Sequence, residues 1–229
     1  GTTTAEQREA VALLYADLKD YAAAQSLMNA LIRESPREPR LRLYLATIVA
    51  RAGDRGATLA ALEEARKLGP SAVDRQRMAF LHQDFKDYGP ARDLLDGLIA
   101  ESPGDLSVRL DRASLAAQTR DVPGGLEHLA AARALKPGPE ERRRMAALYR
   151  DLGELGLARA MIDALIAESP ASPGLLFERA SLAVRSGDRA AALAALAAAH
   201  ESGPGLEERR RIASFYQELK EYGEARGVL

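Results

Sequence analysis

The sequence contains no cysteine and no tryptophan. Without cysteine the chain has no disulfides, thiol nucleophiles or cysteine-ligated metals, and the redox compartment stays undecided. It also lacks a surplus of either charge, since 32 Lys and Arg residues face 33 Asp and Glu residues. That balance argues against a general nucleic-acid or membrane-surface binder. No apolar run approaches the ~18–20 residues that a bilayer-spanning helix needs.

Catalytic and metal-binding patterns are lacking as well. The three histidines, His82, His128 and His200, lie far apart in the sequence, and no H-E-x-x-H or paired-ligand spacing occurs. There is no G-x-S-x-G motif and no phosphate-binding glycine loop. The aspartates and glutamates each have a position typical of a turn or a helix surface. We therefore expect no enzyme activity, no metal and no cofactor.

What the chain does have is an internal repeat. The phrase Leu-Ile-x-Glu-Ser-Pro occurs three times at equal intervals and ends at Pro36, Pro103 and Pro170. Three further prolines, at positions 70, 137 and 204, each lie about half of this interval after a proline of the first set. We therefore call the full interval the double repeat. The basic unit is the half interval, and a fixed period of about 34 residues is typical of a solenoid built from helical pairs.

Each unit reads as two helices. The segment Thr4–Gln7 has the pattern of a capping box, and apolar residues then recur at helical spacing, with Val11, Leu14, Tyr15 and Leu18 on one face. No strand pattern occurs, which predicts an all-α fold. We place the repeats of a single array at 5–38, 39–71, 72–105, 106–138, 139–172, 173–205 and an incomplete 206–229. The turns between paired helices are predicted at Lys19–Asp20, Gly53–Asp54, Lys86–Asp87, Arg120–Asp121, Gly153–Glu154, Gly187–Asp188 and Lys220–Glu221.

The unit resembles the tetratricopeptide repeat, whose pattern is W-x2-L-G-x2-Y, then A-x3-F, then P. In the fifth unit Tyr149, Ala158, Ile162 and Pro170 occupy the tyrosine, alanine, phenylalanine and proline positions. The chain departs from the pattern in its missing tryptophan and in pairs such as Met145–Ala146 at the Leu-Gly position. The resemblance implies a right-handed α-α superhelical solenoid whose first helices line a concave groove that binds other proteins.

Two arginine triplets, 142–144 and 209–211, follow paired glutamates and are also separated by one double repeat. In one interpretation they belong to a helix start, with acidic residues in the first turn that favour the helix dipole. In the other they form a basic rung on the inner face of the superhelix. By family geometry Arg143 and Arg210 are then the residues that face inward.

A second polar series stands near the end of each first helix, on the face that lines the groove in the family. It alternates acidic or neutral residues with basic ones: Asp17, Arg51, Asp84, Gln118, Asp151, Arg185 and Glu218. One interpretation is a ladder of exposed ion pairs, such as Asp84–Arg51 and Asp151–Arg185, each contributing ~0–1 kcal/mol. The other is a polar groove floor that binds a partner and is extended by Gln83, Arg150 and Gln217.

Aromatic residues recur in one register. Tyr15, Tyr149 and Tyr216 share a position in their units, and His82 takes the same place in the third unit. A tyrosine stripe can stack on sugars or peptides, but at helical spacing it is more typical of a core. We predict core positions with the hydroxyl groups at the edge.

The predicted function is a non-enzymatic scaffold for protein–protein interaction. Long arrays rich in arginine, alanine and leucine and free of cysteine also look like the periplasmic arrays of bacterial outer-membrane exopolysaccharide exporters, of the Pel, cellulose and poly-N-acetylglucosamine types. That resemblance implies a periplasmic fragment of a longer protein that recruits a polysaccharide-modifying enzyme in biofilm formation.

Two alternatives remain open. One is a cytoplasmic adaptor for an unrelated complex. The other is direct binding of a polymer in the groove, either polysaccharide or RNA, although the charge balance lowers the expectation for nucleic acid. We expect no membrane contact by this segment.

Overall fold

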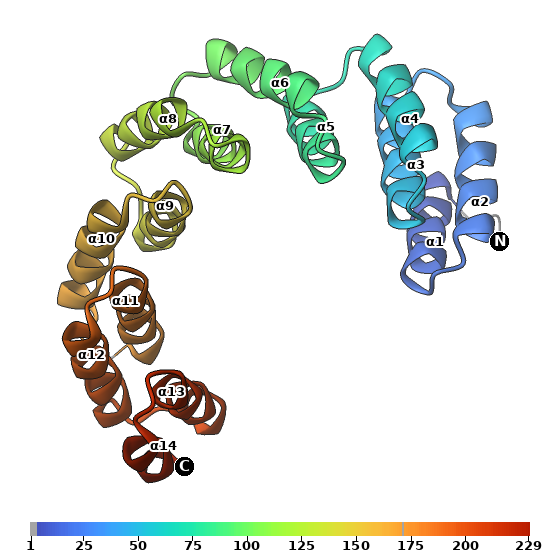
Figure 1. Ribbon diagram of the computed structural model, residues 1–229. Helices are drawn as coiled ribbons and strands as arrows, with labels where there is room; N and C mark the ends of the chain where they lie inside the picture. The colour runs from blue at the N-terminus through green and yellow to red at the C-terminus, as the bar shows by residue number, and fades with distance from the viewer. Residues whose placement is uncertain (1–3, 171) are drawn as a thin grey trace. The chain divides into compact units, whose positions relative to one another are not determined.

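The computed structural model describes residues 4–170 and 172–229, which form fourteen α-helices and no strand (Figure 1). The helices are α1 (Ala5–Asp17), α2 (Tyr21–Glu34), α3 (Pro39–Arg51), α4 (Arg55–Lys67), α5 (Ala72–Asp84), α6 (Tyr88–Glu101), α7 (Leu106–Thr119), α8 (Val122–Ala134), α9 (Pro139–Asp151), α10 (Leu155–Glu168), α11 (Pro173–Arg185), α12 (Arg189–Glu201), α13 (Leu206–Glu218) and α14 (Tyr222–Val228). The predicted all-α fold is confirmed.

The chain divides into two compact units. Unit 1 comprises Gly1–Leu115 and unit 2 comprises Ala116–Leu229, so the division falls inside α7. In unit 1, α1 packs on α2, α3 on α4 and α5 on α6. In unit 2, α9 packs on α10, α11 on α12 and α13 on α14. No helix in the described part of the chain is long and apolar enough to cross a bilayer.

The helices begin where short polar side chains satisfy the first free amides. The predicted capping box of α1 is present: the Gln7 amide donates to Thr4 Oγ1 at 3.2 Å and the Thr4 amide donates to Gln7 Oε1 at 2.9 Å. In the turns between paired helices, aspartate takes over this role. Asp54 and Asp188 accept from the third amide of the following helix, each at 2.9 Å. Such caps contribute about 1 kcal/mol each.

The core consists of small residues facing large ones within and between helix pairs. Ala24 and Met28 on α2, and Ala158 and Ile162 on α10, are almost fully buried. These are the alanine and large-apolar positions of the repeat pattern, because residues four apart lie on one face of a helix. Burying each large side chain contributes roughly 1.5–3 kcal/mol.

The aromatic register is only partly a core feature. Tyr149 and Tyr216 are buried, and His82 is 9% exposed, as the pattern predicts. Tyr15 departs from the prediction because its side chain is 38% exposed. It lies on α1, which no earlier helix precedes in the described residues, so its face has no neighbour to cover it.

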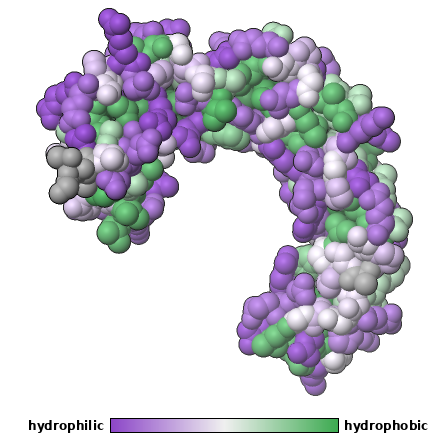
Figure 2. Space-filling model, turned by 180° about the vertical axis from the view of Figure 1, so that it is seen from behind, coloured by the Kyte–Doolittle hydropathy of each residue, from purple (hydrophilic) through white to green (hydrophobic). Residues whose placement is uncertain are grey.

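Hydropathy does not by itself single out a binding surface. On the face drawn in Figure 2, hydrophilic residues predominate and hydrophobic ones lie in scattered groups. Candidate sites therefore have to be located from hollows in the surface and from the charges that line them.

Candidate functional site

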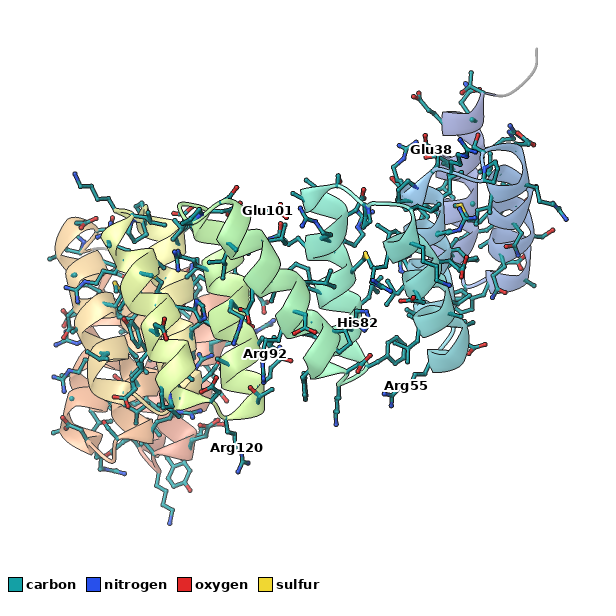
Figure 3. All side chains as sticks on the ribbon, turned by 90° about the horizontal axis from the view of Figure 1, so that it is seen from above. Glu38, Arg55, His82, Arg92, Glu101 and Arg120 are labelled. Atoms are coloured by element: carbon teal, nitrogen blue, oxygen red, sulfur yellow. The ribbon has the colours of Figure 1, made fainter. Side chains whose placement is uncertain are left out.

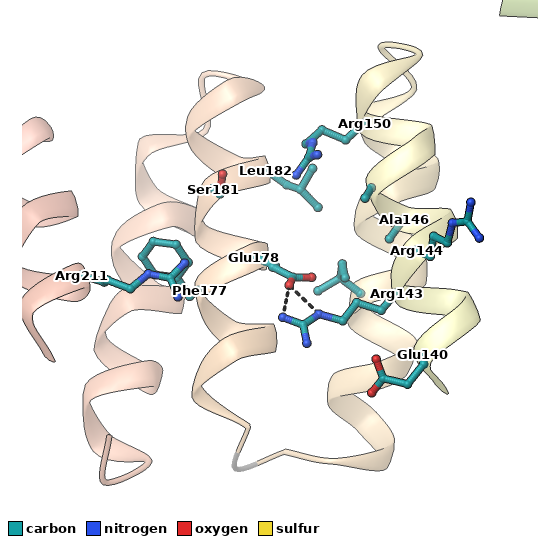
Figure 4. Close-up of a pocket in the computed structure, with 12 residues that line it drawn as sticks. Glu140, Arg143, Arg144, Ala146, Arg150, Phe177, Glu178, Ser181, Leu182 and Arg211 are labelled. Carbon is teal, nitrogen blue, oxygen red and sulfur yellow. Dashed lines mark hydrogen bonds and ion pairs between the residues drawn. The ribbon is translucent and has the colours of Figure 1, made fainter. Parts of the chain in front are cut away.

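A groove in unit 2 gathers charged residues from three first helices, α9, α11 and α13 (Figure 4). Its volume is about 510 Å³. We call it the arginine groove, and it is lined by Glu140, Arg143, Arg144, Ala146, Ala147, Arg150, Ile162, Phe177, Glu178, Ser181, Leu182 and Arg211. The lining thus includes four arginines and two glutamates.

The arginine triplet of α9 splits between two directions because successive helical residues are rotated by about 100°. Arg142 turns toward α10, where its two terminal nitrogens donate to Glu168, both at 2.6 Å. Arg143 turns toward α11, where Nε donates to Glu178 Oε1 at 2.6 Å. Glu140 and Glu141 lie in the first turn of α9, as the helix-start interpretation has it, and Arg143 also lines the groove. The Arg142–Glu168 pair, which joins two helices, belongs to neither interpretation.

Arg211 is held differently, by stacking. Its guanidinium carbon lies 4.3 Å from the centroid of the Phe177 ring. Phe177 in turn makes an edge-to-face contact with Phe215, with ring centroids 4.6 Å apart. Within residues 4–170 and 172–229, Arg211 forms no ion pair with a carboxylate. A guanidinium stacked on an aromatic face keeps its N–H edges available for a planar acceptor.

The electrostatics of the arginine groove favour anions. The hydrogen bond that Arg143 donates to Glu178 raises the pKa of the Arg143 guanidinium, with the charge of Glu140 adding to the effect, so this side chain stays charged. Arg150 donates at 3.0 Å to Asp151, a carboxylate outside the lining of the groove. The groove therefore offers charged donors for carboxylates. In the described part of the chain, no cluster of three or more His, Asp or Glu residues is placed to hold a metal ion.

At the equivalent positions in unit 1, the polar side chains are paired with one another. Arg40 donates to Glu9 at 3.0 Å, and Gln76 donates to Ser107 Oγ at 3.2 Å and to Asp111. Glu9, Gln76 and Arg143 follow one another at the interval of the double repeat, so the Gln76–Asp111 contact is equivalent to the Arg143–Glu178 pair, and the Glu9–Arg40 contact is equivalent to Gln76–Ser107. The two units therefore present different charges at equivalent positions.

The predicted partner-binding residues fall into several groups. Arg143 and Arg150 line the arginine groove. Arg210, predicted to face inward, instead donates to Glu207 at 2.7 Å, and Arg211 takes its place in the groove. The remaining predicted residues that lie exposed outside the lining are Asp17, Arg51, Asp84, Gln118, Asp151, Arg185, Gln217 and Glu218.

Two predicted ion pairs are wrong. Arg51 binds Asp17 at 2.5 Å rather than Asp84. Asp151 binds Arg150, its neighbour in sequence, rather than Arg185. Gln83 also departs from the predicted groove floor, because it is 6% exposed and donates to the Ala79 carbonyl of its own helix at 3.3 Å. Alternation along the sequence gave the right residue types but could not fix which neighbour each side chain meets.

Sequence reasoning missed Arg144, Phe177, Glu178 and Arg211. The signal that was available is the register of the double repeat, which places Arg77, Arg144 and Arg211 at one position. Arg77 lies 5.4 Å from the centroid of the Tyr44 ring, and Arg211 lies over Phe177. An aromatic residue one first helix earlier thus accompanies an arginine in both units.

Comparison with known proteins agrees with this architecture. Residues 10–73 match the tetratricopeptide repeat family model. The comparison with curated proteins gave no match. A tetratricopeptide repeat protein from Parabacteroides merdae is 18% identical, covers 98% of this chain and 97% of its own, and has a TM-score of 0.65.

Two further structures have a similar fold. PilW, a widely conserved type IV pilus biogenesis factor, is 18% identical over 91% of this chain and 97% of its own, with a TM-score of 0.65. PilF of Pseudomonas aeruginosa is 18% identical over 94% and 96%, with a TM-score of 0.61. At this identity the similarity concerns the fold alone.

The protein is thus an all-α solenoid of helix pairs. Its resemblance to the tetratricopeptide repeat is confirmed, by sequence for residues 10–73 and by fold for the chain as a whole. This fold is typical of protein-interaction scaffolds.

Proposed function

We propose that the protein is a non-catalytic scaffold that binds an acidic, extended segment of another protein in the arginine groove. The observation that supports this most directly is Arg211, which is stacked on Phe177 and has no carboxylate partner in the described residues. Stacking fixes the guanidinium before a ligand arrives, and this reduces the entropy lost on binding. A planar carboxylate then meets a donor edge of matching geometry.

The neighbouring charges extend this site along the groove. Arg143 is paired with Glu178 and Arg150 with Asp151, and Arg144 lies beside them in the lining of the groove on α9. A segment with several acidic residues meets more than one of these cations, and a lysine-rich segment is repelled. The affinity falls with rising salt because the contacts are partly exposed.

The experiment is a titration of a fluorescein-labelled octaglutamate peptide, followed by fluorescence anisotropy at low and physiological salt. We expect Arg211→Gln to weaken binding about 5- to 10-fold, which corresponds to one charge-assisted hydrogen bond of roughly 1–1.4 kcal/mol. Arg226→Gln is the matched control, since it removes the same charge from an exposed site on α14. Equal affinities of the two variants, or tighter binding of octalysine, would exclude the arginine groove as the site.

The cellular context is a further proposal. We propose that the protein acts in exopolysaccharide export, with a polysaccharide-modifying enzyme as its partner and the periplasm as its compartment. An acidic surface segment on that enzyme is then the ligand of the groove. Cell fractionation separates this context from a cytoplasmic adaptor, because recovery of the protein with cytoplasmic markers contradicts the periplasmic proposal and leaves the groove unaffected.

A further inference from the structure

Unit 2 contains a second hollow, away from the arginine groove, between the end of α8 and the pair α9–α10. Its volume is about 360 Å³. We call it the α8–α10 cleft, and it is lined by Arg133, Lys136, Pro137, Arg142, Tyr149, Leu157, Ala160, Met161 and Ala164. None of these residues lines the arginine groove.

The cleft combines a basic edge with an apolar wall. Arg133 and Lys136 form no ion pair with a carboxylate in the described part of the chain, and no acidic residue lines the cleft. Across from them, Leu157 is 43% exposed, and Met161 is partly buried beside it. The C-terminal dipole of α8 favours a cation at this end of the helix. The dipole accounts for the cations but does not account for the exposed Leu157 in the same cleft.

Tyr149 forms the inner end of the cleft. Burial raises the pKa of its hydroxyl group, and the charge of Arg133 opposes that rise. The hydroxyl therefore stays protonated near neutral pH and is a hydrogen-bond donor close to the basic edge. A ligand with an acceptor group meets donors of three kinds here.

The equivalent cleft in unit 1 provides an internal comparison. It lies between α4, α5 and α6 and has a volume of about 620 Å³. Its lining contains Arg66, His82 and Leu94, which precede Arg133, Tyr149 and Met161 by one double repeat. The cleft is therefore a feature of the double repeat. Its position on α5 is marked by His82 in Figure 3.

The charges of this cleft are reversed. Arg66 is bound by Glu63 at 2.8 Å, and His82 Nδ1 lies 2.9 Å from Asp87 Oδ2. Asp93 adds a third acidic residue to the lining. Unit 1 thus neutralises the basic edge that unit 2 leaves open, although the shape of the two clefts comes from the same repeat.

We infer that the α8–α10 cleft is a docking site for an acidic segment of a partner protein that inserts a bulky aliphatic side chain. The apolar wall of Leu157 and Met161 takes the aliphatic group, and Arg133 and Lys136 bind the acidic residues that flank it. Charge complementarity selects this ligand, because a basic segment is repelled here and a purely acidic one leaves the wall uncovered. The site is separate from the arginine groove and adds a second contact point on unit 2.

The four methionines make this site directly observable. Met161 lines the cleft, Met78 lines its counterpart in unit 1, and Met28 and Met145 are buried in the cores. The experiment labels the methionine methyl groups with ¹³C and records NMR spectra during titration with a ten-residue peptide of two leucines flanked by glutamates. We expect the Met161 signal to shift to saturation and the signals of Met78, Met28 and Met145 to stay in place.

Two comparison peptides test the required chemistry. A peptide with lysines in place of the glutamates is expected to leave Met161 unchanged. An all-glutamate peptide is expected to bind at least 5-fold more weakly. Equal shifts of Met161 and Met78, no shift at millimolar peptide, or equal affinity of the all-glutamate peptide would each overturn the inference.

The variants separate this site from the arginine groove. The double variant Arg133→Gln, Lys136→Gln is expected to weaken the response of Met161 at least 10-fold. Its matched control is Lys220→Gln, Arg226→Gln, because Lys220 has the same left-handed backbone as Lys136, with φ of 62° and 56°. Arg211→Gln should leave the response of Met161 intact. The proposal for the α8–α10 cleft and the proposal for the arginine groove can therefore be refuted independently. An unchanged affinity of the double variant would contradict the docking site.

Discussion

One residue with a left-handed backbone sets the turn inside each helix pair. The residues at this position with positive φ are Lys19, Gly53, Lys86, Arg120, Gly153, Gly187 and Lys220. Glycine adopts this conformation without steric cost, whereas residues with a Cβ atom lose roughly 1–2 kcal/mol. The three glycine turns are therefore relaxed, and the four lysine or arginine turns retain some strain.

Gly153 shows how much this conformation matters. Its φ is 87°, and nothing lies within 4 Å of the position where a Cβ would stand. Gly153→Ala is therefore expected to destabilise unit 2 by about 1 kcal/mol through the backbone alone. Chemical denaturation measures the change. Gly156→Ala is the control, because it lies in α10 with open space around it and should stabilise by about 0.5 kcal/mol. Equal effects of the two substitutions would argue against backbone strain.

The positions of these turns were predictable from the sequence. Glycine, lysine or arginine followed by an acidic residue interrupts the apolar spacing in every unit, and the helices do end there. The partners of exposed side chains were not predictable. Arg51 has an aspartate at the same position in the unit before and in the unit after, and only the three-dimensional packing selects Asp17.

Among the helices, the repeated phrase Leu-Ile-x-Glu-Ser-Pro has a second role besides ending a helix. Its glutamates bind an arginine of the preceding helix through both terminal nitrogens, in Arg8–Glu34, Arg75–Glu101 and Arg142–Glu168. The donor–acceptor distances run from 2.5 to 2.7 Å. The phrase was readable as the closing turn of a second helix, whereas its link to the first helix needed the structure.

The Arg142–Glu168 pair gives stability a specific dependence on pH. The hydrogen bond from Arg142 lowers the pKa of Glu168 below its ordinary value of 4.5. A carboxyl group with a depressed pKa in the folded state contributes stability above its unfolded pKa and loses it as pH falls through the folded value. We expect Glu168→Gln to lower the thermal midpoint at pH 7 and to lose this effect progressively below about pH 4.5.

The control for this pH dependence is Glu127→Gln on α8, whose side chain is exposed and forms no ion pair within the described residues. Thermal denaturation at several pH values compares the two variants with the parent protein. A difference between Glu168→Gln and the parent that persists unchanged to pH 2 contradicts the assignment to ionisation.

A glycine on α8 packs directly against Leu152, the residue that follows α9. A Cβ atom built on Gly125 would stand 2.7 Å from Leu152 Cδ1, well inside contact distance. Gly125→Ala is therefore expected to destabilise unit 2 by about 1–3 kcal/mol in chemical denaturation. The cost should shrink in a Leu152→Ala background, where the crowding atoms are absent. An equal cost in both backgrounds would locate the effect elsewhere.

The candidate site was predictable only in outline at this scale. The arginine triplets and Arg150 pointed to the arginine groove, whereas the alternating series of charges near the ends of the first helices lies outside its lining. The stacking of Arg211 on Phe177 depends on the rotation of α13 against α11, and a one-residue error in that rotation chose Arg210 instead. Helical period fixes a face to within about 100°, which is too coarse to choose between neighbours in a charged run.

At the scale of the whole molecule, a solenoid transmits instability only to its neighbours. Leu62 on α4 is fully buried among Leu43, Ala46 and Met78, which belong to α3 and α5. Leu62→Ala is expected to cost about 2–5 kcal/mol locally. Hydrogen exchange followed by mass spectrometry should then show faster exchange in α3, α4 and α5 and unchanged exchange in α11 and α12.

Leu196 supplies the reciprocal experiment because it holds the same position in the repeat, two double repeats later, and is fully buried on α12. Leu196→Ala should accelerate exchange in α11, α12 and α13 and leave α3 and α4 unchanged. If either substitution instead accelerates exchange throughout the chain, the protein unfolds as one cooperative body. In a chain of nearest-neighbour contacts, the two responses are confined to separate units. A ligand bound in the α8–α10 cleft is therefore expected to slow hydrogen exchange in unit 2 and to leave exchange in unit 1 unchanged.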